Sequence, residues 1–169
     1  MNLVIIGRLP ADTEARIRAF FPPDWRVVFA VPDLAGSCLR DAEALIPEHL
    51  PINAALLDRA PKLRMIQTGA GYDNVDLAEC TRRGILVCSA AGVNATAVAE
   101  HTMALILGWY KSIVYLDTFL KAHRHSRELR YSGGELCGKT VGIIGLGAIG
   151  QRVSALCRAF GMNVLGHSR

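Results

Sequence analysis

The chain has 169 residues, of which 51% are hydrophobic and 20% charged, and it carries a formal net charge of +4. This composition is typical of a globular protein with a buried core and excludes a disordered or fibrous chain. The apolar runs are too short to span a bilayer, the N-terminus lacks the features of a signal peptide and the basic residues are dispersed, so we expect a cytoplasmic protein without a membrane or nucleic-acid partner.

Short apolar runs alternate with helical patterns in the first half of the chain. The runs Leu3–Ile6 and Arg26–Ala30 indicate strands, with a helix over residues 13–20 between them. Further strands are expected at 41–46, 63–68 and 85–88, and further helices at 52–59 and from a cap at Asp73 or Asn74 to Arg82. Strands that alternate with helices predict a parallel sheet. Residues 1–93 are therefore expected to form one α/β domain.

A longer helical pattern extends from about Ala95 to Ala122 and is apolar on most faces. A helix of this kind is buried against a neighbour on each side, so we expect it to lie between two domains. The stretch from Arg124 to Gly138 contains glycine and basic residues, and we expect it to lead into a second domain. Residues 94–138 are thus predicted to form a hinge, an interdomain helix and a connection.

A glycine-rich motif stands between two predicted strands in residues 139–169. The motif GLGAIG follows a strand at 139–144 and precedes a helix at 151–160 and a second strand at 163–167. This is the context of a dinucleotide-binding fingerprint, in which successive glycines make the turn, admit the pyrophosphate and let the helix pack on the strand. The candidate cofactor-binding residues of the motif are Gly145, Leu146, Gly147, Ala148, Ile149 and Gly150. The alternative is that the glycines serve only a tight turn.

The residues after the second strand of this motif bear on the choice of cofactor. Folds that bind NAD place an acidic residue there, on the ribose 2′-hydroxyl. Here the position holds Ser168, followed by Arg169, and neither side chain would repel a 2′-phosphate. The sequence therefore favours NADP over NAD, with the alternative that Arg169 is only a solvated surface residue.

Three stretches of this sequence resemble one enzyme family. They are APKLRMIQTGAGYDNVDL, GVNATAVAEHTMALIL and GKTVGIIGLGAIGQRVSALCRAFGMNVLGHSR, and together they resemble the D-isomer-specific 2-hydroxyacid dehydrogenases, which include phosphoglycerate, glyoxylate and hydroxypyruvate reductases. The resemblance implies a flavodoxin-like substrate domain followed by the start of a Rossmann dinucleotide-binding domain, of which residues 139–169 are the first βαβ unit. It also implies an oxidoreductase that transfers a hydride between NAD(P)H and a small 2-keto or D-2-hydroxy acid.

The resemblance assigns substrate-binding roles to a few residues. Backbone amides at Ala70 and Gly71 match the family's carboxylate-binding loop, and amides in a glycine-containing turn do form an anion-binding concavity. The alternative is an ordinary turn. Asn94 matches a hinge residue near the family's active site, and it could equally cap the following helix. We also expect a homodimer formed through the region of the interdomain helix.

The family's catalytic Arg, His and carboxylate match no residue of this chain, because these motifs would lie beyond position 169. His101, His123 and His125 precede the fingerprint and do not match the catalytic motif, and no metal site is predicted. Five cysteines without a CxxC pair indicate reduced thiols. We therefore expect residues 1–169 alone to be inactive. The competing hypothesis is a non-catalytic NAD(P)-sensing or partner-binding remnant of the same fold.

Overall fold

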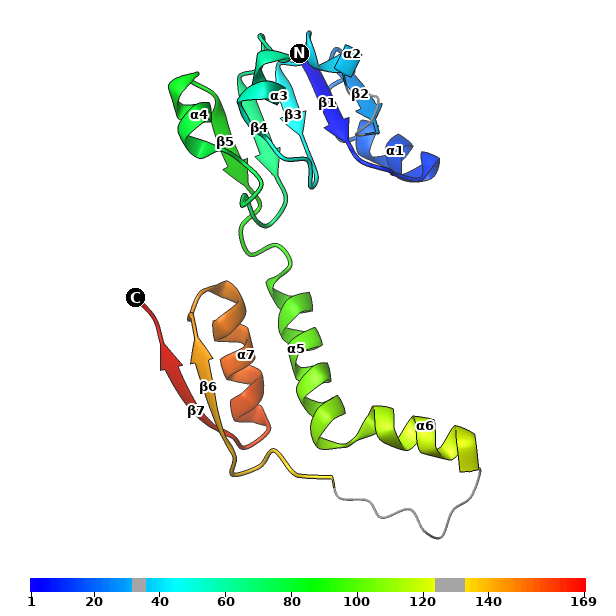
Figure 1. Ribbon diagram of the computed structural model, residues 1–169, viewed down its shortest axis with the longest axis vertical. Helices are drawn as coiled ribbons and strands as arrows, with labels where there is room; N and C mark the ends of the chain where they lie inside the picture. Colours follow the sequence, from blue (N-terminus) through cyan, green and yellow to red (C-terminus); the bar gives the residue numbers. More distant parts are fainter. Residues whose placement is uncertain (32–35, 124–132) are drawn as a thin grey trace. The chain divides into compact units, whose positions relative to one another are not determined.

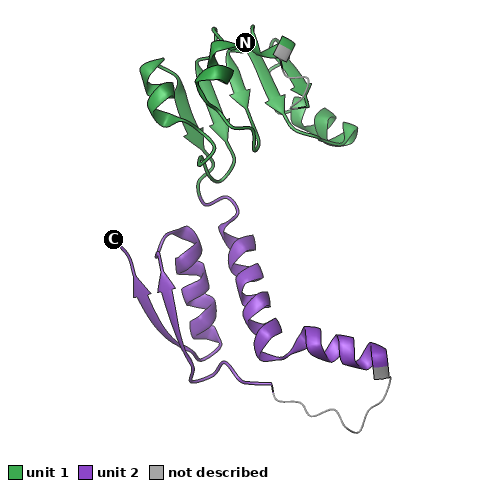
Figure 2. Cartoon of the chain, viewed as in Figure 1, with its two compact units in different colours: residues 1–91 green, residues 92–169 purple. Residues whose placement is uncertain are grey.

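The computed structural model describes residues 1–31, 36–123 and 133–169. The chain divides into two compact units, Met1–Ala91 and Gly92–Arg169 (Figure 2). The helix that we expected to stand between domains belongs to the second unit. His125 and most of the predicted connection lie outside the described residues.

Unit 1 is built on a five-stranded parallel sheet in the order β2-β1-β3-β4-β5 (Figure 1). Its strands are β1 (Asn2–Ile6), β2 (Arg26–Ala30), β3 (Ala44–Ile46), β4 (Met65–Thr68) and β5 (Leu86–Ser89). Its helices are α1 (Ala11–Arg18), α2 (Gly36–Leu39), α3 (Ala54–Asp58) and α4 (Leu77–Arg82). The chain runs outward from β1 to β2 and then returns to β3 on the other side of β1, so the strand order reverses between β1 and β3.

Both faces of this sheet are buried at β1, as is typical of parallel sheets. Alternate residues of β1 point to opposite faces: Val4 and Ile6 pack with Leu45 and Ile66 on one side, and Leu3 and Ile5 pack on the other. Every apolar residue of β1 is therefore buried, which explains why its sequence is a continuous apolar run. The α/β class and the parallel sheet are confirmed.

Several boundaries in unit 1 differ from the prediction, each for a local reason. Helix α1 begins at Ala11 rather than residue 13 and ends at Arg18, and α2 was not predicted. β3 begins only at Ala44, because the amide of Ala42 donates to the carbonyl of Leu39 in a turn. The cap of α4 is Asp76, whose Oδ1 accepts the amide of Glu79 at 2.9 Å.

The two residues that we predicted as caps of α4 do not cap it. Asn74 instead donates from its side-chain amide to the carbonyl of Leu50 at 2.8 Å. Ile52, predicted as helical, pairs with Val75 in an isolated parallel bridge, and Asn53 caps α3 by accepting the amide of Leu56 at 3.1 Å. These contacts tie the segments that precede α3 and α4 to each other.

Unit 2 contains α5 (Ala95–Tyr110), α6 (Ile113–His123), β6 (Thr140–Ile144), α7 (Ala148–Ala159) and β7 (Asn163–His167). β6 and β7 pair in parallel, and α5 and α7 lie side by side (Figure 1). Their core contains Ala99, Met103, Val153 and Cys157, with the Cys157 thiol 3.7 Å from the sulfur of Met103. The predicted strand–helix–strand order of the fingerprint is present.

The prediction of one helix from Ala95 to Ala122 is wrong, because the helix breaks at Lys111 and Ser112. Ser112 has a φ of 50°, in the left-handed region, and the axes of α5 and α6 differ in direction by 55°. The apolar pattern continues across the break and so conceals it. Leu105 and Trp109 are 63% and 85% exposed, so α5 is not buried all round.

Across the described residues, no single helix has both the length and the apolar composition of a membrane span. Helices α5 and α6 meet that criterion only when they are taken together across their bend.

Candidate functional site

The turn after β6 is shaped by Gly145. This residue has a φ of 94°, which side chains disfavour, and its amide donates to the carbonyl of His167 at 2.8 Å. The turn is therefore fixed to the end of β7, and the chain reverses within two residues to begin α7 at Ala148, three residues earlier than predicted.

The other two glycines of the motif differ in what the protein requires of them. A Cβ on Gly150 would collide with the carbonyl oxygen of Gly145 and lie 3.4 Å from Ile143 Cγ2, so packing of α7 on β6 demands glycine there. A Cβ on Gly147 would meet no atom within 4 Å, and the φ of Gly147 is −72°. The fold thus gives no reason for glycine at 147, whereas close approach of a ligand to the backbone does.

The start of α7 is suited to bind phosphate. The first amides of a helix have no partner inside the helix and lie at the positive end of its dipole. Gly147 caps α7 without a side chain, and the Gln151 side-chain amide donates to the carbonyl of Leu146 at 3.0 Å. Leu146 lies over β7, because a Cβ on Gly166 would be 2.8 Å from its Cδ1. The Leu146 side chain thus packs on the protein and does not extend over the start of α7.

Ser168 and Arg169 follow β7 next to this turn. The register pairs Ile144 with His167, so the residue after His167 stands beside Gly145. Both Ser168 and Arg169 are exposed, and the Ser168 hydroxyl is 3.3 Å from the carbonyl of Arg169. The predicted cofactor-binding residues of unit 2 therefore lie together at one end of the β6–β7 pair.

The predicted substrate loop of unit 1, residues 69–73, follows β4 and is anchored at its start. The Thr68 hydroxyl donates to the carbonyl of Cys88 at 3.2 Å, and the amide of Ala90 donates to the carbonyl of Gly69 at 2.9 Å. Between these anchors and the bridge at Val75, Ala70 and Gly71 are exposed. The loop therefore presents its backbone to solvent from fixed ends.

Gly71 also makes room for a side chain of the loop itself. A Cβ on Gly71 would be 3.3 Å from Oδ2 of Asp73. A larger residue at 71 would crowd both this carboxylate and any ligand at the loop amides.

Asn94 is exposed and stands at the start of α5, but its side chain makes no capping hydrogen bond. The structure therefore gives no support to the capping alternative for its side chain. Gly92, which we did not predict as a site residue, has a φ of 78°, and a Cβ on it would lie 3.3 Å from Ala148 Cβ. Gly92 thus lies against the start of α7. A glycine two residues before Asn94 is the feature of the sequence that could have identified this position.

The described residues contain no group of His, Cys, Asp and Glu that could hold a metal ion. Of the groups in this part of the chain whose pKa is clearly shifted, none lies on the two candidate loops. Hydrogen bonds from Arg82 and Arg83 lower the pKa of Glu79 to about 2, and burial raises the pKa of the Cys157 thiol. Glu79 lies on α4, and Cys157 lies in the core of unit 2.

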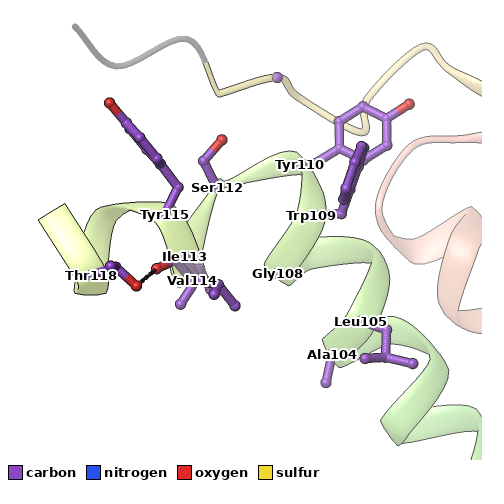
Figure 3. A pocket seen from close by; sticks show the side chains of 11 residues that line it. Ala104, Leu105, Gly108, Trp109, Tyr110, Ser112, Ile113, Val114, Tyr115 and Thr118 are labelled. Atoms are coloured by element: carbon purple, nitrogen blue, oxygen red, sulfur yellow. Dashed lines mark hydrogen bonds between the residues drawn. The ribbon is translucent and has the colours of Figure 1, made fainter.

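A large hollow of about 1000 Å³ lies at the bend between α5 and α6 (Figure 3). Leu105, Trp109, Ile113 and Val114 line it, and the Thr118 hydroxyl donates to the carbonyl of Val114 at 2.9 Å. Its lining is mainly apolar and includes none of the predicted site residues, so it is suited to a protein contact and not to acid–base chemistry.

Residues 30–163 match the family described as D-isomer specific 2-hydroxyacid dehydrogenase, catalytic domain. A D-3-phosphoglycerate dehydrogenase of Mycobacterium leprae is 39% identical over 147 residues, which are 86% of this chain and 26% of that protein.

Two solved structures share the fold. D-lactate dehydrogenase of Aquifex aeolicus, complexed with NAD and lactic acid, has a TM-score of 0.87 at 29% identity, and the match covers 99% of this chain and 51% of that one. An NADPH-dependent glyoxylate/hydroxypyruvate reductase of Sinorhizobium meliloti has a TM-score of 0.82 at 26% identity, covering 99% and 54%.

This chain spans about half the length of these two solved chains and a quarter of the mycobacterial protein. The family match covers most of the chain and includes both candidate loops. The chain therefore belongs to the D-isomer-specific 2-hydroxyacid dehydrogenase family.

Proposed function

We propose that the chain is part of an oxidoreductase that transfers a hydride between a nicotinamide dinucleotide and a small 2-keto or D-2-hydroxy acid. The observation that carries this proposal is Gly147, where neither backbone angle nor packing calls for glycine but ligand approach does. When bound, the cofactor would supply the hydride that adds to the keto carbon, and the reaction also needs a proton donor.

The residues of this chain bind and orient the substrate and the cofactor. Amides of Ala70 and Gly71 hold the substrate carboxylate, and the start of α7 holds the pyrophosphate. The named activities of the relatives favour an enzyme over a non-catalytic sensor. The candidate substrates are of the glyoxylate, hydroxypyruvate or phosphoglycerate type.

The test is carboxylate binding by the loop. Titration of the 169-residue chain with oxalate or glycolate should shift the NMR signals of the Ala70 and Gly71 amides. Gly71→Val, which crowds Asp73 and the anion, should weaken this binding at least about tenfold, whereas Tyr72→Ala should weaken it less, because the Tyr72 side chain is not part of the amide site. Unchanged binding by Gly71→Val would rule out the loop.

We further propose NADP(H) as the preferred cofactor, since Ser168 and Arg169 stand where an acidic residue would select NAD. The relatives include both an NAD complex and an NADPH-dependent reductase. In the complete enzyme, kcat/KM should be higher with NADPH than with NADH, and Ser168→Asp should reverse the order. Preference for NADH in the unaltered enzyme would contradict this assignment.

The exposed apolar side chains around the bend of α5 and α6 support a homodimer, which we propose forms through this region. The five thiols at Cys38, Cys80, Cys88, Cys137 and Cys157 are free, which suits a reducing cytoplasm. In light scattering, Trp109→Glu together with Val114→Glu should convert a dimer into a monomer.

A further inference from the structure

Glu48 has an unusual backbone conformation at the carboxyl end of β3. Its φ is 49°, and among the described residues only Ser112 shares a positive φ without being glycine. Ser112 ends a helix, but Glu48 stands in the turn after Pro47 and is exposed. Non-glycine residues with a positive φ are uncommon, and such strained residues cluster at functional sites.

The carboxylate of Glu48 rests on the backbone at the end of β1. A Cβ on Gly7 would lie 2.6 Å from Glu48 Oε2 and 3.3 Å from its Cδ. Gly7 is buried, and its amide extends the β1–β2 ladder by donating to the carbonyl of Ala30 at 3.0 Å. Glycine at position 7 thus leaves the space that this carboxylate occupies.

The sheet order places Glu48 at the same end of the sheet as the predicted substrate loop. β3 pairs with β1 on one side and with β4 on the other, so the residues after β3 lie between those after β1 and the loop 69–73 (Figure 1). The order of strands also reverses between β1 and β3, and open α/β sheets bind ligands at the carboxyl ends beside such a reversal. Glu48 is therefore a fixed negative charge at the expected ligand edge.

We propose that Glu48 is a specificity-determining residue that excludes substrates with an anionic side chain and accepts those with a neutral or hydroxyl-bearing one. This inference rests on the proposed carboxylate loop. With the substrate carboxylate at Ala70 and Gly71, a phosphate on the side chain would meet the Glu48 carboxylate, whereas a hydroxyl could donate to it. Asp73 adds negative charge at the same loop. The substrate class is then that of glyoxylate and hydroxypyruvate.

The test compares D-glycerate with 3-phosphoglycerate, which differ by the phosphate. The 169-residue chain is titrated with each acid while the amide signals of Ala70 and Gly71 are followed, and the ratio of the two Kd values is taken. Glu48→Gln should shift this ratio toward 3-phosphoglycerate by about tenfold, and Glu48→Lys should shift it further. Gly7→Ala, which displaces the carboxylate without removing its charge, should shift the ratio less. Asp24→Asn removes a charge just before the amino end of β2, away from the carboxyl ends of the strands, and should leave the ratio unchanged.

The outcomes separate this inference from the proposed function. If neither acid shifts the amide signals of Ala70 and Gly71 in the unaltered chain, the assignment of the carboxylate loop is wrong. The proposed specificity role of Glu48, which rests on that assignment, is then overturned as well. If D-glycerate binds but the ratio is the same in Glu48→Gln, Glu48→Lys and the unaltered chain, only the role of Glu48 is overturned. Glu48 is exposed, so its variants should keep the dispersed spectrum of the folded chain.

Discussion

At the scale of single residues, the three glycines of GLGAIG meet different physical demands. Gly145 is needed for its backbone angle, Gly150 for the close packing of α7 on β6, and Gly147 for neither. The sequence predicts the motif and the role of each glycine through its flanking strand and helix. It could not show how Glu48 lies against Gly7, because that contact joins the ends of two strands far apart in the sequence.

These demands predict opposite effects of substitution on stability and on binding. Gly150→Ala should lower the free energy of unfolding of unit 2 by about 1–3 kcal/mol, since its Cβ collides with backbone. Gly147→Ala should change that free energy by less than about 0.5 kcal/mol. Urea denaturation of the two variants measures both values.

The same pair of variants is then compared in cofactor binding. In the complete enzyme, Gly147→Val should weaken binding of NADPH although its fold is stable. Equal destabilisation by alanine at 147 and at 150 would show that packing, and not a ligand, explains both glycines.

At the scale of elements, the strands were easier to predict than the helix ends. β1, β2 and β7 occupy continuous apolar or alternating runs close to those expected. Burial on a sheet face requires apolar side chains at regular positions, and this regular pattern can be recognised in the sequence. The cap of α4 was misplaced among Asp73, Asn74 and Asp76, since three residues of the same chemistry stand within four positions. In the structure, the bridge of Ile52 to Val75 lies between Asn74 and the cap at Asp76.

Helix α4 should make unit 1 sensitive to acid. Arg82 and Arg83 donate hydrogen bonds to Glu79 and lower the pKa of its carboxyl to about 2, and Arg83 also contacts Asp58 at 2.7 Å. A carboxyl with a lowered pKa stabilises the fold above its usual pKa and loses that contribution as the pH falls toward the lowered value. Stability due to Glu79 should therefore decline between about pH 4.5 and pH 2.

Urea midpoints at pH 7 and pH 2.5 test this expectation. Glu79→Gln should be less stable than the unaltered chain at pH 7, and the difference should shrink at pH 2.5. Asp24→Asn, which lies in a turn before β2, serves as a control with little change at either pH. A gap for Glu79→Gln that is the same at both pH values would contradict the role of this ion pair.

At the scale of the whole molecule, substrate and cofactor loops are carried by different units. Unit 1 holds the predicted carboxylate loop and unit 2 holds the fingerprint. Ile144 and Leu165, on the pair β6–β7, are 90% and 65% exposed. Such uncovered apolar strands favour association.

Residues 1–169 should therefore lack catalysis by themselves. Purified chain should show no oxidation of NAD(P)H with glyoxylate, hydroxypyruvate or pyruvate, because the transition state needs a proton donor and a cation on the carboxylate. It should also bind NADPH weakly, because residues 139–169 form only one βαβ unit of the dinucleotide fold. Turnover that Gly147→Val abolishes would contradict this expectation and would place an acid–base residue within the chain.

The unequal demands on the glycines also have an evolutionary consequence. A descendant that lost its cofactor would remain under selection to fold, so Gly145 and Gly150 would persist while position 147 would be free to drift. Among homologues, a motif that keeps its first and last glycine but has a larger residue in the middle should therefore mark a lineage that has abandoned the dinucleotide. Under the proposed function, the glycine at the middle position of this chain is the one that dinucleotide binding, and not folding, would preserve.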